Sequence, residues 1–122
     1  MDKHHSKYQI TQLSAGEEYS IELYPKDEVV KAKYIGQGKL EGFGNQHLFI
    51  SEGKDKNYIA MNDYWLRKKD DGILTYAPIS SFSTLRINKS GLGEMLDSEN
   101  VHYKNLGLRI IRFLESFGEK FD

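Results

Sequence analysis

Apolar and polar residues alternate along much of the first 88 positions, which is the pattern of half-buried β-strands. The predicted strands cover residues 8–13, 19–24, 29–35, 46–51, 58–61, 73–77 and 79–87. A Gly-Gln-Gly turn at 36–38 and charged hairpin tips at 52–57 and 68–72 separate them. The glycines at 42 and 44 flank an aromatic residue, as is typical of a strand that bends or bulges.

The pattern changes to a helical period after residue 88. One apolar stripe is formed at 3.6-residue spacing by Leu106, Ile110, Phe113, Leu114 and Phe117. A shorter helix is predicted around 92–96, with Ser98 as the cap of the longer one. Gly118 is placed to end the long helix, and Phe121 is expected to fold back beyond it. Gly107 inside the stripe predicts close approach of another backbone.

Strands followed by helices predict an α+β fold, with a bent, small-barrel-like antiparallel sheet and C-terminal helices. The 122 residues are expected to form a single domain, 1–122. Within it we expect a frayed start at 1–7, a sheet over 8–88 and a helical part over 89–122.

Charge and composition restrict the function further. The chain has no cysteine, which excludes disulfides and thiolate metal sites. It has no leader-type start and no run long enough to span a bilayer, so a soluble, cytoplasmic protein without membrane contact is predicted. Lys and Arg number 17 against 18 Asp and Glu, so a global basic field is absent and nucleic acid is an unlikely partner.

Catalytic motifs are nearly absent from the sequence. There is no nucleophile elbow, P-loop, paired-histidine zinc motif or cysteine nucleophile. The histidines are scattered, at positions 4, 5, 47 and 102, and the paired carboxylates at 27–28 and 70–71 lie in predicted turns. We therefore predict a protein that is not an enzyme and that has no catalytic residues, metal site or cofactor.

A binding site for an anionic ligand is the better-supported prediction. Arg109 and Arg112 lie beside the apolar stripe and carry the forked donors that suit phosphate. Phe82 has the opposite strand parity to Leu85 and Ile87, which predicts an exposed aromatic face for stacking a base. The candidate ligand-binding residues are Phe82, Arg86, Asn88, Tyr103, Arg109 and Arg112.

A structural interpretation of the same residues stands beside this one. Phe82 is then a core residue of a sheet buried on both sides, and the two arginines pair with Glu115 or Glu119 on the helix surface.

Leu108 and Ile111 lie on a third side of the helix, where a helix packed on one sheet is normally polar. They predict a second contact surface, and with it a homo-oligomer, at least a dimer, formed through the C-terminal helix.

Two resemblances follow from this layout. Residues 29–87, with their glycine-bent second strand and the closing run from Ala77 to Ile87, are similar to Sm-like or SH3-like small barrels. In length and in the order of sheet first and helices last, the whole chain resembles the phage Thoeris anti-defence proteins of the first type.

The second resemblance implies a non-catalytic, oligomeric sponge in the host cell cytoplasm. It would hold a cyclic ADP-ribose-type nucleotide signal at a subunit interface and so keep that signal from the effector of an anti-phage defence. Phe82, Arg109 and Arg112 match the aromatic platform and the arginines that grip the pyrophosphate. The alternative is a small-barrel interaction module that binds RNA, through Lys31 and Lys33, or a host protein. Hydrolysis of a nucleotide is a third possibility.

Overall fold

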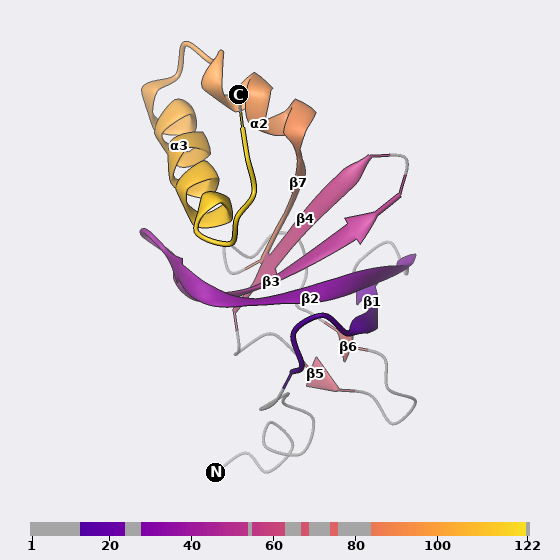
Figure 1. Cartoon of the computed structure of the whole chain (residues 1–122). Helices are drawn as coiled ribbons and strands as arrows, with labels where there is room; N and C mark the ends of the chain where they lie inside the picture. The colour runs from indigo at the N-terminus through magenta and orange to yellow at the C-terminus, as the bar shows by residue number, and fades with distance from the viewer. Residues whose placement is uncertain are drawn as a thin grey trace.

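An antiparallel sheet followed by two helices forms the described part of the chain (Figure 1). The computed structural model describes residues 13–23, 28–53, 55–62, 67–68, 74–75 and 84–121. The frayed start at 1–7, nearly all of the predicted 8–13 strand and Phe82 lie outside these residues. Within them the order of sheet and helices confirms the predicted α+β fold.

Five strands form the antiparallel part of the sheet. They are β1 (Glu18–Leu23), β2 (Glu28–Leu40), β3 (Gly44–Glu52), β4 (Lys56–Met61) and β7 (Thr84–Asn88), paired in that order. Two short strands extend it beyond β1: β6 (Leu74–Thr75) runs parallel to β1, and β5 (Arg67–Lys68) pairs with β6. The described strands therefore make an open sheet that ends in β5 and β7, and they do not close into a barrel.

The turn predicted at 36–38 is wrong, because β2 continues to Leu40 and keeps its pairing with β3. The register shifts between Tyr34 and Gly36, which marks a bulge. A Cβ atom would lie only 3.2 Å from the Phe117 ring at either Gly36 or Gly38. These glycines leave room for that ring against the strand. The chain instead turns at 41–43, where the amide of Phe43 donates to the carbonyl of Leu40 at 2.8 Å.

The sheet is buried on both faces at β3 and β4, since strand residues point alternately to either side. One face carries the cluster Ile21, Ala32, Tyr34, Phe49, Ile59 and Met61. The other face, here called the helix-covered face, carries Leu40, Leu48, Ile50, Tyr58 and Ala60. The helices pack on this second group and complete the larger core cluster.

Helices α2 (Lys89–Leu96) and α3 (Val101–Glu115) lie on one side of the sheet, with α3 against β2 and α2 beside β7 (Figure 1). Both helices were predicted. The apolar stripe of α3 is confirmed, since Ile110, Phe113 and Leu114 are at most 3% exposed. Among the described residues, no helix is both long and apolar enough to cross a lipid bilayer.

The predicted cap of α3 is wrong by two residues. The side chain of Asn100 accepts hydrogen bonds from the amides of His102 and Tyr103, at 3.0 and 3.2 Å. Ser98 instead accepts a bond from the amide of Asn100 and shapes the link between the helices. Both residue types cap helices well, so the sequence alone does not decide between them.

Two glycines of the helical part behave as predicted. Gly107 is buried where α2 crosses α3, and a Cβ atom there would lie 3.0 Å from Cβ of Met95 and 3.8 Å from the amide nitrogen of Leu96. Gly118 takes a φ of 92° just after the end of α3. The chain then reverses, and the ring of Phe121 packs 6.0 Å from that of Tyr58.

Candidate functional site

The two arginines of α3 lie together over the turn between β2 and β3. A Cβ atom at Gly42 would be 3.0 Å from Nη1 of Arg109, so this guanidinium lies directly against the turn. Nη1 of Arg112 is 3.9 Å from a carboxylate oxygen of Glu41, in the same turn. One helix face and one glycine-containing turn thus bring two guanidinium groups to the same side of the molecule.

The helix-surface pairing expected for these arginines is not found within the described residues. Arg112 pairs with Glu41 and not with Glu115, and Glu119 bonds to Lys56. The Arg112–Glu41 pair is long, and its side chains are 71% and 67% exposed. An exposed pair of this kind contributes only about 0–1 kcal/mol.

The other candidate residues lie apart from the arginines. Arg86 pairs in register with Ile59, and cross-strand partners share a face, so Arg86 points to the side of the sheet without helices. Asn88 caps α2, its side chain accepting a bond from the amide of Gly91 at 2.8 Å. Tyr103, in the first turn of α3, is 46% exposed. The structure therefore brings together Arg109 and Arg112, but not these three.

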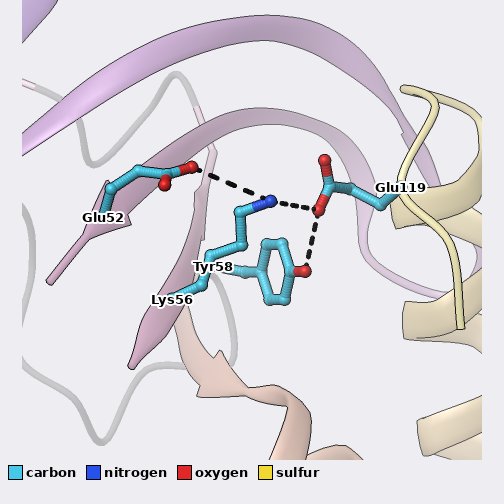
Figure 2. Close-up of polar contacts among 4 residues, drawn as sticks. All are labelled: Glu52, Lys56, Tyr58 and Glu119. Carbon is cyan, nitrogen blue, oxygen red and sulfur yellow. Dashed lines mark hydrogen bonds and ion pairs between the residues drawn. The ribbon is translucent and has the colours of Figure 1, made fainter. Parts of the chain in front are cut away.

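A polar network that the sequence did not predict joins β4 to the segment after α3 (Figure 2). One carboxylate oxygen of Glu119 accepts bonds from Nζ of Lys56 at 2.9 Å and from the hydroxyl of Tyr58 at 2.8 Å. Glu52, at the end of β3, lies 3.8 Å from the same ammonium group. We call Lys56, Tyr58 and Glu119 the Glu119 network.

Electrostatics hold the Glu119 network in one protonation state. Burial raises the pKa of Glu119, but hydrogen bonds from Lys56 and Tyr58 and the positive charges of Lys56 and Lys89 outweigh this and leave the pKa lowered. The hydrogen bond to Glu119 raises the pKa of Lys56. Burial, and then the bond to Glu119, raises the pKa of Tyr58. The folded chain thus favours a carboxylate, an ammonium and a neutral phenol.

Replacement of Glu119 by glutamine is expected to lower the free energy of unfolding at neutral pH by about 1 kcal/mol, since it removes charge-assisted hydrogen bonds. The folded-state pKa of Glu119 is lowered, so its stabilisation is complete above the ordinary value of 4.5 and is lost as the pH falls through the folded value. Urea unfolding at a series of pH values should show the gap between wild type and Glu119→Gln closing in acid. Glu115→Gln, on the exposed end of α3, is the control and should change little.

Two surface hollows flank Lys89. The first, of about 430 Å³, is polar and is lined by Asp55, Lys56, Asn88, Lys89 and Ser90. The second, of about 200 Å³, lies between α2, α3 and the segment after α3, and apolar side chains and two lysines line it. Asn88 is the one predicted binding residue that lines either of these two hollows.

The remaining polar groups give no metal-binding arrangement within the described residues. No three His, Asp or Glu side chains gather there in a way that could hold a metal ion. His47 is buried, and its Nδ1 lies 2.8 Å from the hydroxyl of Tyr34 inside the core of the face without helices. This hydrogen bond is what a buried polar pair needs for stability.

Comparisons with protein-family models, with curated proteins and with solved structures find no match to this chain.

Proposed function

We propose that the protein binds and sequesters a small nucleotide of the cyclic ADP-ribose type without transforming it, and so counteracts a bacterial anti-phage defence. The resemblance to the Thoeris anti-defence proteins supplies the ligand class. The placement of Arg109 and Arg112 over one turn is the observation that supports it. A pyrophosphate offers two adjacent anionic groups, and two neighbouring guanidiniums match them.

The partner that Arg112 now has is easily replaced. Glu41 and Arg112 are both mostly exposed, and 3.9 Å is too long for a good hydrogen bond. A phosphate held by both nitrogens of a guanidinium makes shorter, charge-assisted bonds worth about 1.5–3 kcal/mol each. Ligand phosphate therefore competes favourably with Glu41 for Arg112.

A second copy of the chain would supply the other wall of the site. Val101 and Leu108 are 64% and 39% exposed, seven residues apart on the outer side of α3. Arg112 follows Leu108 by four residues, so it lies on the same side. In a two-fold dimer that buries Leu108, each copy's Arg112 lies at the edge of the interface, and two equivalent sites result.

Calorimetry with cyclic ADP-ribose isomers tests the proposal. Arg109→Ala combined with Arg112→Ala is expected to weaken binding by at least about 100-fold, because two charge-assisted contacts of about 1.5–3 kcal/mol each are lost. Lys104→Ala, an exposed cation on the same helix, is the matched control and should bind like wild type. Ligand released by heating the complex should be chemically unchanged, whereas hydrolysed ligand would point to an enzyme. Absence of heat with every isomer would leave the proposal without support.

An interaction module remains the second candidate, and one surface favours it. Val29, Lys31 and Lys33 alternate along β2 and are exposed. Glu18 pairs with Lys33 across the strands and offsets its charge, which favours a protein partner over RNA. RNA retained at moderate salt and lost in Lys31→Ala/Lys33→Ala would support RNA binding instead.

A further inference from the structure

We propose that the hollow between α2, α3 and the segment 119–121 binds a small carboxylate with an apolar body, such as an aryl or short-chain alkyl acid. We call it the carboxylate hollow. It is separate from the arginine pair on which the proposed nucleotide site depends, and it requires a different class of ligand.

The size and lining of the carboxylate hollow suit one ring or a short chain. Its walls are formed by Leu92 and Leu96 of α2, Ile111 of α3, and Phe121. Its volume is about 200 Å³. An apolar cavity of roughly 150 Å³ is enough to bind benzene. A single aromatic ring with a short substituent therefore fits, whereas a dinucleotide does not.

Gly93 also lines the hollow and has no side chain to fill it. A Cβ atom built there meets no atom within 4 Å, so the helix backbone itself borders empty space. This contrasts with Gly107 on the neighbouring helix, where a Cβ atom would lie 3.0 Å from Met95. Gly93 thus leaves space on the side of α2 that lines the hollow, although no neighbouring atom of the protein requires a glycine at this position.

Charge decides which apolar molecule the hollow prefers. Lys89 and Lys120 both line it, and among the described residues no acidic side chain does. The carboxylate of Glu119 interacts with Lys89, but it already accepts hydrogen bonds from Lys56 and Tyr58. Nζ of Lys89 lies 5.5 Å from the centre of the Phe121 ring, a cation–π contact that leaves the ammonium exposed to an incoming anion. Two cations beside an apolar base complement a carboxylate on an apolar body. A neutral molecule with the same apolar body lacks the ion pair with the lysines and binds more weakly.

The Glu119 network keeps one wall of the hollow in place. Glu119 is hydrogen-bonded to Lys56 and Tyr58 of β4. Phe121, two residues after Glu119, packs on the ring of Tyr58. The wall is therefore formed before a ligand arrives. A preformed site loses less entropy on binding than one that must first be ordered.

Two-dimensional NMR of the ¹⁵N-labelled full chain, titrated with 3-phenylpropionate, benzoate and hexanoate, tests the proposal. Saturable shifts are expected at Gly93 and Ile111, with Kd of about 0.1–1 mM for the best acid. Benzyl alcohol, which has a similar body without the charge, should bind at least about 5-fold more weakly. Lys89→Gln combined with Lys120→Gln should remove this preference for the acids, and Lys104→Gln should preserve it.

Gly93→Leu gives an independent test, because it places a side chain in the hollow without a clash at Cβ. It should fold like wild type, gain helix propensity and weaken binding of the acids by at least about 10-fold. Three results would each overturn the proposal: no saturable shift with any acid up to about 10 mM, equal affinity for benzyl alcohol and the acids, or unchanged binding by folded Gly93→Leu.

Discussion

Replacement of Phe113 by alanine is expected to lower the free energy of unfolding by about 3–5 kcal/mol, the usual cost of removing a buried phenylalanine. Phe113 is 3% exposed and belongs to the core of the helix-covered face. Its ring packs edge-on against Phe117, with the centroids 5.1 Å apart, and approaches the position of a Cβ atom at Gly38 to 3.8 Å. The backbone of β2 cannot move into the space that alanine would leave, so a cavity remains.

Urea unfolding followed by circular dichroism measures this loss. Lys104→Ala is the matched control, because Lys104 lies on the same helix and is exposed. Its cost should stay below about 1 kcal/mol, since surface substitutions seldom exceed that range. Equal losses for the two variants would contradict the packing of α3 on the sheet.

Replacement of Gly107 by leucine is expected to destabilise the fold by about 3 kcal/mol, in the upper part of the range for overpacked cores. Gly107 is buried at the crossing of α2 and α3, with Met95 close above it. Even a methyl group must push Met95 away, and a leucine side chain must separate the helices. The better helix propensity of leucine, worth about 1 kcal/mol, is too small to offset this.

The same substitution at Gly93 is the control for Gly107, because both glycines lie inside helices and only one is crowded. Gly93→Leu should leave the midpoint of thermal unfolding unchanged or raise it by a few degrees. A Gly107→Leu variant as stable as Gly93→Leu would mean that the two helices do not approach each other here.

Features that depend on residues close together in the sequence could be predicted from it. The 3.6-residue spacing located the buried side of α3 because burial follows that period directly. The break after Asn88 likewise follows from a change of period, since β7 ends there and α2 begins at Lys89. The close approach at Gly107 was predictable because glycine destabilises a helix interior, so a glycine there indicates that another part of the chain packs closely against it.

Features decided by distant residues were not predictable. Gly36 and Gly38 form a Gly-Gln-Gly sequence typical of a turn, yet Phe117, about 80 positions later, lies over them and β2 continues. Local turn preference is weak compared with pairing to β3 and packing of an aromatic ring.

The same distinction applies to the candidate site: local spacing predicts one part of it, and long-range packing decides the other. Arg109 and Arg112 are three residues apart on one helix, so their proximity follows from the sequence. Their contact with the turn at Glu41 and Gly42 does not, because it depends on where α3 crosses the sheet. Arg86 is a candidate only through its closeness in sequence to Phe82, and strand parity places it on the face of the sheet without helices.

The Glu119 network also has a consequence for biosynthesis. The hydroxyl of Tyr58 finds its acceptor 61 residues further along the chain, and the ammonium of Lys56 finds the same carboxylate at a separation of 63. A nascent polypeptide still attached to the ribosome therefore has β4 long before it has residue 119. Until that residue emerges, Lys56 and Tyr58 of β4 lack the carboxylate that accepts their hydrogen bonds. Final closure of this domain is accordingly expected only after residue 119 has left the ribosome.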